Sequence, residues 1–165
     1  MTLIFNFVKL LRPLNVLIAF CSILIATDLL DGFNNFKIFL YQVGVVCFFT
    51  AGANALNDAI DYKTDLINCP KRPIASGALS RDLAIFISFI CFAIGMLFCL
   101  QLNDDAKRIG IIISMPLMIV YSTHLKGRAL IGNIVVAIIL GLSFLFCGAV
   151  YQNYNPMWVP SLLAF

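Results

Sequence analysis

The stretch that decides the fold is Ile38–Asn57, IFLYQVGVVCFFTAGANALN, which contains no charged side chain. A helix needs roughly 20 mostly apolar residues to cross the hydrocarbon core of a bilayer. Ile38–Asn57 meets this need and predicts a membrane-spanning helix. Its later part carries the polar residues Thr50, Asn54 and Asn57. Polar groups are costly in a membrane and usually functional there, so a site is expected near the end of this span.

Other uncharged stretches on both sides predict more spans. They are Pro13–Thr27, which continues past Asp28 through Leu29 and Leu30, Leu83–Asn103, Ile109–Leu125 apart from His124, and Ala129–Phe165, which Gln152–Pro156 divides. We therefore expect five complete spans and the opening of a sixth at Met157–Phe165. Backbone groups in lipid must satisfy their own hydrogen bonds, so the expected fold class is all-α, a multi-span transmembrane helical bundle.

The composition supports the same interpretation and excludes several classes of function. Of the 165 residues, 62% are hydrophobic and 12% are charged. A soluble domain carries about 25% charged residues, so a soluble enzyme, a nucleic-acid binder and a disordered tail are all disfavoured. The net charge of +3 is too small to indicate nucleic acid. The six cysteines form no C-x-x-C pair, which argues against a zinc site or a disulfide framework.

The basic residues are sorted between the two ends of the expected bundle. One end carries Lys9, Arg12, Lys63, Lys71, Arg72, Arg81, Lys126 and Arg128, and the other carries Lys37, Lys107 and Arg108. The positive-inside rule then predicts a multi-pass protein of the cell membrane with a cytoplasmic N-terminus and cytoplasmic larger basic loops. Residues 1–11 are expected to form a short interfacial helix rather than a signal peptide.

Charge is concentrated in the aspartate-rich segment, residues 57–77, NDAIDYKTDLINCPKRPIASG, with three of the eight acids and three of the eleven bases. If the second span continues as a helix, Asn57, Asp61 and Asp65 share one face, with Asp58 beside them. Carboxylates on one face repel each other unless cations lie between them. Aspartate oxygens suit Mg²⁺, which also binds substrate phosphates, so the stripe suits a metal-bridged diphosphate.

Lys71 and Arg72 follow the stripe and can contact phosphate oxygens directly. Pro70 and Pro73 flank this pair and stiffen its backbone. The alternative is a solvated loop in which acids and bases simply pair with one another. The continuation of the polar stripe into the membrane favours a site over this alternative.

The segment resembles the UbiA-type intramembrane prenyltransferases, whose first signature is N-D-x-x-D-x-x-x-D followed by R-P-I-x-S-G. Here it stands as Asn57-Asp58-x-x-Asp61-x-x-x-Asp65 and Arg72–Gly77. The resemblance extends over essentially the whole chain. Its other parts are Leu11-Arg12-Pro13-Leu14-Asn15, Tyr121-Ser-Thr-His124-Leu-Lys126, and Leu130-Ile131-Gly132-Asn133-x-x-Val136-Ala137, the last of which resembles the archaeal ether-lipid branch.

This resemblance implies an Mg²⁺-dependent enzyme that moves an isoprenyl group from its diphosphate to an acceptor. The metal ligands it implies are Asn57, Asp58, Asp61 and Asp65, and the catalytic residues are Asp61, Asp65 and Lys126. The diphosphate contacts it implies are Asn57, Arg72, Lys71, Arg128 and Tyr121. The archaeal branch implies transfer of a geranylgeranyl group to geranylgeranylglyceryl phosphate. The partners implied are the prenyl diphosphate, this lipid-precursor acceptor and the surrounding membrane lipid. Neither nucleic acid nor a protein partner is expected.

Two alternatives remain beside this interpretation. One is an aromatic acceptor, as in quinone or chlorophyll pathways. The other is a non-catalytic fragment of a transporter or channel, which would need polar residues at mid-depth on several helices.

One departure from the family pattern is large. The family has a second aspartate-rich motif after its sixth span, whereas no acid follows Asp105 here and the chain ends at Phe165. We therefore expect residues 1–165 to be the N-terminal portion of a single transmembrane prenyltransferase domain. We also expect this portion alone not to turn over prenyl diphosphate.

Overall fold

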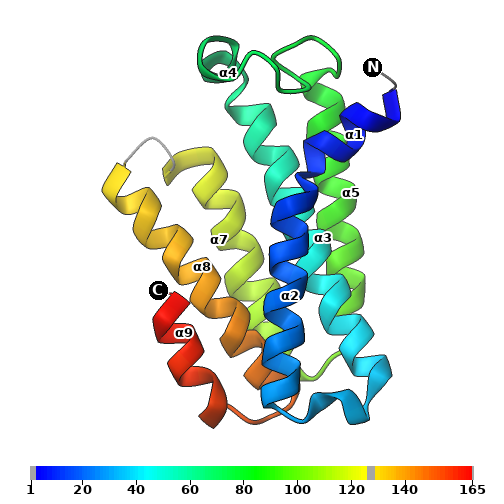
Figure 1. The fold of residues 1–165 in the computed structure, drawn as a ribbon, viewed down its shortest axis with the longest axis vertical. Coiled ribbons are helices and arrows are strands. Elements are labelled where there is room, and N and C mark those ends of the chain that lie inside the picture. The colour runs from blue at the N-terminus through cyan, green and yellow to red at the C-terminus, as the bar shows by residue number, and fades with distance from the viewer. Residues whose placement is uncertain (1–2, 126–128, 165) are drawn as a thin grey trace.

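The computed structural model describes residues 3–125 and 129–164, and every regular element within these ranges is a helix. The α-helices are α1 (Leu3–Leu11), α2 (Pro13–Leu29), α3 (Phe36–Ile60), α4 (Tyr62–Asn68), α5 (Arg81–Cys99), α6 (Asp104–Lys107), α7 (Met115–Val120), α8 (Ala129–Val150) and α9 (Trp158–Ala164). Two π-helical segments, η2 (Arg108–Ser114) and η3 (Tyr121–Leu125), flank α7. Short 3₁₀ turns, η1 (Gly32–Asn34) and η4 (Asn155–Met157), lie in connections. The expected all-α bundle is confirmed (Figure 1).

By length and composition, four helices in the described residues can cross a membrane: Phe36–Ile60, Arg81–Cys99, Asp104–Leu125 and Leu130–Val150. The third of these is α6, η2, α7 and η3 joined end to end. A fifth span is reached if α1 and α2, which meet at a 46° bend, count as one. The first expected span corresponds to α2, and the expected opening of a sixth is the short α9.

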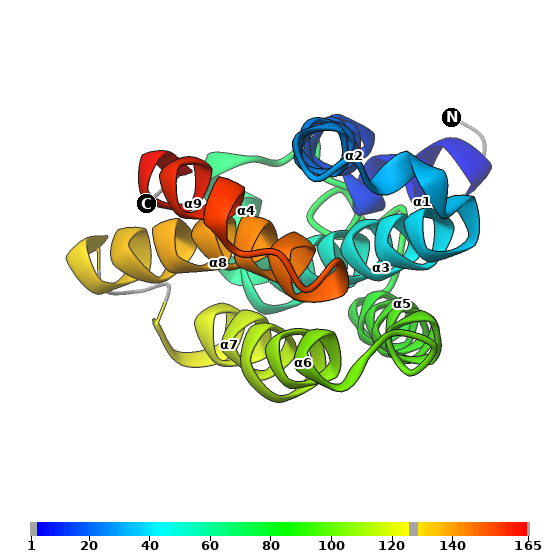
Figure 2. The same cartoon turned by 90° about the horizontal axis from the view of Figure 1, so that it is seen from below.

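Helix α3 is the centre of the bundle, and it lies between α2 and α5 in Figure 2. Its contact with α5 is close because glycines leave room for the neighbouring helix. A Cβ atom on Gly95 would lie 2.5 Å from the Phe49 ring. The Ser88 hydroxyl donates a 2.8 Å hydrogen bond to the Gly52 carbonyl oxygen across the same interface. Small residues and side-chain hydrogen bonds of this kind join helices in lipid.

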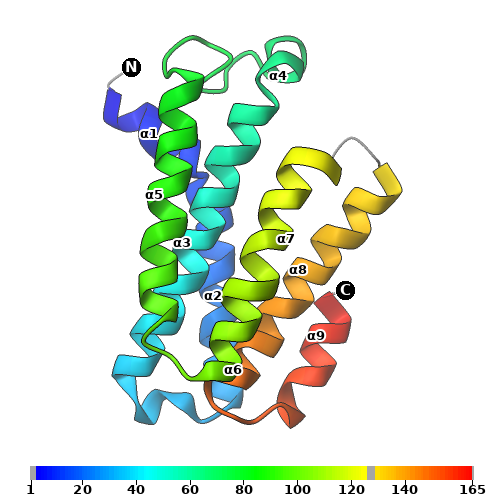
Figure 3. The ribbon, with the colours of Figure 1, turned by 180° about the vertical axis from the view of Figure 1, so that it is seen from behind.

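The two ends of the bundle differ in charge. Helices α1 and α4 and the loop that leads into α5 gather at one end, which we call the basic end (Figures 1 and 3). These elements carry Lys9, Lys63, Lys71, Arg72 and Arg81, and Arg12 lies between α1 and α2. Lys37 lies in the first turn of α3, Lys107 ends α6 and Arg108 begins η2, and these parts of the helices are at the other end. The expected sorting is present, while Lys126 and Arg128 lie outside the described residues.

The loop 69–80 is packed onto the basic end of the bundle. Pro73 is fully buried, and Ile74 and Leu79 join a hydrophobic cluster with Leu10 of α1 and Ala59 of α3. The Arg81 side chain adds a 3.0 Å hydrogen bond to the Ala59 carbonyl oxygen. This burial fixes the loop, and with it Arg72, against the end of α3.

Candidate functional site

The first part of the aspartate-rich segment, up to Asn68, stays helical past the end of α3. Helix α3 stops at Ile60 and α4 starts at Tyr62. The backbone pattern nevertheless continues, because the Asp61 N–H donates to the Asn57 carbonyl at 2.9 Å and the Asp65 N–H donates to the Asp61 carbonyl at 2.8 Å. The spacing of four residues from Asn57 to Asp61 and from Asp61 to Asp65 is therefore a helical spacing, as predicted.

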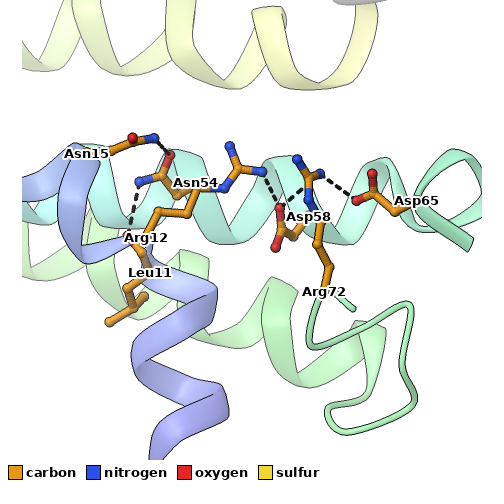
Figure 4. Close-up of polar contacts among 7 residues, drawn as sticks. All are labelled: Leu11, Arg12, Asn15, Asn54, Asp58, Asp65 and Arg72. Atoms are coloured by element: carbon orange, nitrogen blue, oxygen red, sulfur yellow. Dashed lines mark hydrogen bonds and ion pairs between the residues drawn. The ribbon is translucent and has the colours of Figure 1, made fainter. Parts of the chain in front are cut away.

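Two arginines meet two aspartates at this point, in a group that we call the arginine–aspartate cluster: Arg12, Asp58, Asp65 and Arg72 (Figure 4). Arg12 forms an ion pair with Asp58, whose side chain is only 2% exposed. Arg72 lies 3.5 Å from the Asp58 carboxylate and 2.6 Å from that of Asp65. Burial opposes the charge on Arg72, but the hydrogen bond to Asp65 and the nearby carboxylates outweigh it and raise the pKa of Arg72. Arginine stays protonated in proteins, so Arg72 is a cation beside these carboxylates.

The break between α1 and α2 positions Arg12. Its backbone is left-handed, with φ 52° and ψ 73°, a conformation uncommon for residues other than glycine. The Asn54 side-chain amide donates a 3.0 Å hydrogen bond to the Leu11 carbonyl, and the Asn15 amide donates a 3.3 Å hydrogen bond to the Asn54 side-chain oxygen. Arg12 was absent from the predicted site residues, although the Arg12-Pro13 pair was part of the resemblance.

A cavity of about 370 Å³ lies between α2, α3, α8 and the helix that contains η2 and α7. Its lining is mainly apolar, with Val45, Phe49, Met118, Ile139 and Phe146 among the larger side chains. Asn15, Asn54, Asn57 and Tyr121 also line it. The cavity can thus take an apolar chain and place amides and a phenol along it.

Asn57, which lines this cavity, and Asp61, four residues later, carry side-chain oxygens of the kind that divalent cations prefer. The Asn57 side-chain oxygen is buried and has no hydrogen-bond partner among the described residues. No group of three or more His, Cys, Asp or Glu side chains gathers in the described part of the chain. Mg²⁺ needs only one or two carboxylates when phosphate oxygens and water complete its shell. The residues therefore fit an Mg²⁺ ion shared with a phosphate ligand rather than one enclosed by protein.

The other predicted site residues are placed as follows. Asp58, predicted as a metal ligand, faces Arg12 and Arg72. Asp65 is buried and bound to Arg72. Lys71 is exposed, and its carbonyl accepts a hydrogen bond from Lys9. Tyr121 lines the cavity. Lys126 and Arg128 lie outside the described residues.

Comparison with known proteins gives relatives along nearly the whole chain. "Digeranylgeranylglyceryl phosphate synthase" of Methanosphaera stadtmanae is 36% identical over 163 residues, which are 96% of this chain and 57% of the relative. The protein of the same name from Methanothermobacter thermautotrophicus is 37% identical over 144 residues, 87% of this chain and 50% of the relative. The chain thus spans about half the length of these curated relatives.

A solved structure has the same fold. It is described as "Structural and mechanistic insights into the biosynthesis of Digeranylgeranylglyceryl phosphate synthase in membranes" and aligns with a TM-score of 0.91 at 28% identity. The alignment covers 99% of this chain and 59% of that one. The sequence profile described as "UbiA prenyltransferase family" matches residues 15–165. The chain therefore belongs to the UbiA prenyltransferase family.

Proposed function

We propose that this protein is an integral membrane prenyltransferase that moves a geranylgeranyl group from its diphosphate to geranylgeranylglyceryl phosphate. The observation that carries the proposal is the apolar cavity lined by Asn57, whose neighbour Asp58 belongs to the arginine–aspartate cluster. A prenyl diphosphate needs an apolar cavity for its chain and cationic side chains for its diphosphate. The names of the relatives support the choice of acceptor.

The prenyl chain would lie in the cavity with its diphosphate at the basic end. Arg72 and Lys71 would contact the phosphate oxygens, and Tyr121 would face the same ligand from η3. Arginine suits this task because its planar group donates several hydrogen bonds to phosphate oxygens at once. Lys126 and Arg128 are proposed as further contacts on the connection between η3 and α8.

Asn57, Asp61 and Asp65 would hold the metal, with Mg²⁺ as the ion that suits their oxygen donors. When bound, Mg²⁺ would neutralise negative charge on the departing diphosphate. Asp65 is also a hydrogen-bond acceptor of Arg72, at 2.6 Å. It would therefore orient that guanidinium as well as contribute oxygen to the site.

The reaction breaks the bond between the first prenyl carbon and the diphosphate oxygen, and the electron pair leaves with the diphosphate. The allylic cation that remains is attacked by the acceptor hydroxyl oxygen, which then gives its proton to the departed diphosphate. Water would capture such a cation, so a dry binding site is required. The apolar cavity walls, including Phe49, Met118 and Phe146, would exclude water from it.

The test is titration of geranylgeranyl diphosphate into the detergent-purified protein, with and without Mg²⁺. Asp61→Ala and Arg72→Ala should each weaken Mg²⁺-dependent binding by about tenfold or more, because each removes a charged contact. Arg108→Ala is the matched control, since Arg108 is exposed at the opposite end and pairs with Asp105 at 3.4 Å. Equal binding by wild type, Asp61→Ala and Arg72→Ala would contradict the proposed site.

The acceptor is tested by competition in the full-length protein. Geranylgeranylglyceryl phosphate and a hydroxybenzoate would be offered together with radiolabelled geranylgeranyl diphosphate. Label in the glyceryl lipid is the expected result. Label in the aromatic product would support the aromatic-acceptor alternative, and no label in either would contradict transfer.

A further inference from the structure

We propose that Asp58 is a positioning residue that holds Arg12 and Arg72 side by side for the diphosphate, and that Arg12 is a further diphosphate contact. The proposal rests on the proposed function, because it concerns the site of the same ligand. It also gives Asp58 a role other than that of metal ligand.

The first argument is the burial and charge of Asp58. Its side chain is 2% exposed, while those of Arg12 and Arg72 are 27% and 31% exposed. A buried carboxylate is costly unless cations and hydrogen bonds compensate its charge. Both arginines approach the same oxygen, Oδ1. Asp58 is therefore the common anchor of two cations that stay partly open to solvent.

The second argument is the number of donors left on the arginines. Arg12 uses Nη2 to reach Asp58, and Arg72 uses Nη1 to reach both Asp58 and Asp65. A guanidinium has five N–H donors, so both side chains keep donors beyond these contacts. In Figure 4 the two guanidinium groups lie next to each other over Asp58, each with a nitrogen directed away from the carboxylate. Two such groups together suit a diphosphate, which has several oxygens on adjacent phosphorus atoms.

The third argument is how firmly the backbone of each arginine is held. Arg12 occupies an uncommon left-handed conformation, and such conformations persist only where the surroundings determine them. Here Asn54 fixes the preceding carbonyl and is itself bound by Asn15. Arg72 precedes the fully buried Pro73. Two independent segments are thus fixed so that their arginines meet at one carboxylate.

The position next to the cavity is the fourth argument. Asn54 and Asn57 line the cavity, and Asp58 follows Asn57 on the same helix. A diphosphate at the basic end of the cavity would therefore lie near both arginines. A metal ion on Asp58 would have to sit beside two guanidinium groups, those of Arg12 and Arg72, whereas the described ion pair of Asp65 is with Arg72. The repulsion is therefore stronger at Asp58 than at Asp65, which is proposed as a metal ligand.

The experiment compares Asp58→Asn with wild type for binding of inorganic diphosphate, geranylgeranyl diphosphate and geranylgeraniol over a range of Mg²⁺ concentrations. Removing a negative charge beside an anion site would by itself strengthen anion binding. The positioning role predicts the opposite, a loss of about tenfold or more in affinity for both diphosphates without Mg²⁺. The half-saturating Mg²⁺ concentration and geranylgeraniol binding should not change. Asp82→Asn, at an exposed aspartate in the first turn of α5, is the matched control.

The outcomes are distinguishable. Unchanged or tighter diphosphate binding by Asp58→Asn overturns the positioning role, and so does a higher half-saturating Mg²⁺ concentration, which would mark a metal ligand. Loss of geranylgeraniol binding by Asp58→Asn would mean that this variant is misfolded, and Arg12→Gln then replaces it. Arg12→Gln should lose about tenfold in affinity for both diphosphates without Mg²⁺. An unchanged diphosphate affinity of Arg12→Gln would overturn the proposal. Wild-type protein that binds inorganic diphosphate but not geranylgeranyl diphosphate would contradict the proposed function and leave the arginine pair as an anion site.

Discussion

The Asn54 side-chain amide donates a 3.0 Å hydrogen bond to the Leu11 carbonyl oxygen, joining α3 to the end of α1. In a continuous helix the Leu11 carbonyl would accept a hydrogen bond from the Asn15 N–H. Here the helix breaks, and the Asn15 N–H donates to the Arg12 carbonyl at 2.9 Å instead. A carbonyl of this kind needs another donor when it is away from water. Asn54 supplies that donor and thereby fixes the backbone from which Arg12 reaches Asp58.

Asn54→Ala should therefore weaken both the fold and the site. Loss of a largely buried hydrogen bond should cost about 1–3 kcal/mol of stability, measured as a lower thermal unfolding midpoint in detergent. Diphosphate affinity should fall as well, because Arg12 would no longer be held over Asp58. Asn34→Ala is the control, since Asn34 is exposed and its 3.1 Å hydrogen bond to the Asp31 carbonyl is local. Equal midpoints for both variants would contradict this role of Asn54.

Asn57→Ala should separate metal binding from stability. The side-chain oxygen of Asn57 is buried without a hydrogen-bond partner among the described residues, so its removal should leave metal-free stability unchanged or increased. The Mg²⁺ concentration for half-maximal prenyl diphosphate binding should rise by about tenfold, as expected for loss of one ligand. Calorimetric titration with Mg²⁺ and thermal unfolding check the two effects. An unchanged Mg²⁺ requirement would remove Asn57 from the metal site.

Ala53→Phe should fill part of the cavity. Ala53 lines it on α3, so the larger ring would take space that the prenyl chain needs. Affinity for geranylgeranyl diphosphate should fall, while affinity for inorganic diphosphate should stay at the wild-type value because the arginine–aspartate cluster is untouched. Leu97→Phe is the control, because Leu97 is 60% exposed on α5. A parallel loss of both affinities in Ala53→Phe would show that the cavity and the diphosphate site are not separable in this way.

The orientation in the membrane can be tested with single reporter cysteines in a variant whose six native cysteines are replaced by serine or alanine. Ser76→Cys adds an exposed thiol to the loop 69–80, and Asn34→Cys adds one to η1, the turn that joins α2 to α3 at the opposite end of the bundle. The excess of basic residues at the first end predicts that it faces the cytoplasm. In intact cells, a membrane-impermeant maleimide should label Asn34→Cys and leave Ser76→Cys unlabelled until the cells are opened. The reverse pattern would contradict the predicted orientation.

The features that were predictable from the sequence are those set by neighbouring residues. Uncharged stretches such as Ile38–Asn57 predicted spanning helices because length and apolarity determine whether a helix can sit in lipid. The spacing of Asn57, Asp61 and Asp65 predicted that the helical turns continue, which the backbone hydrogen bonds confirm. The roles of these residues in metal binding remain predictions.

The cluster and the cavity were not predictable in the same way. Periodicity cannot show that Arg12 meets Asp58, because the two residues are 46 positions apart and approach only when α1, α2 and α3 pack. The same holds for the cavity, whose walls come from four parts of the chain. The sequence by itself determined the helical membrane fold and the residues of the aspartate-rich segment, because apolar length and helical spacing are local properties. Only the tertiary structure decided which charges pair and where the cavity opens, because those contacts depend on how distant helices pack against each other.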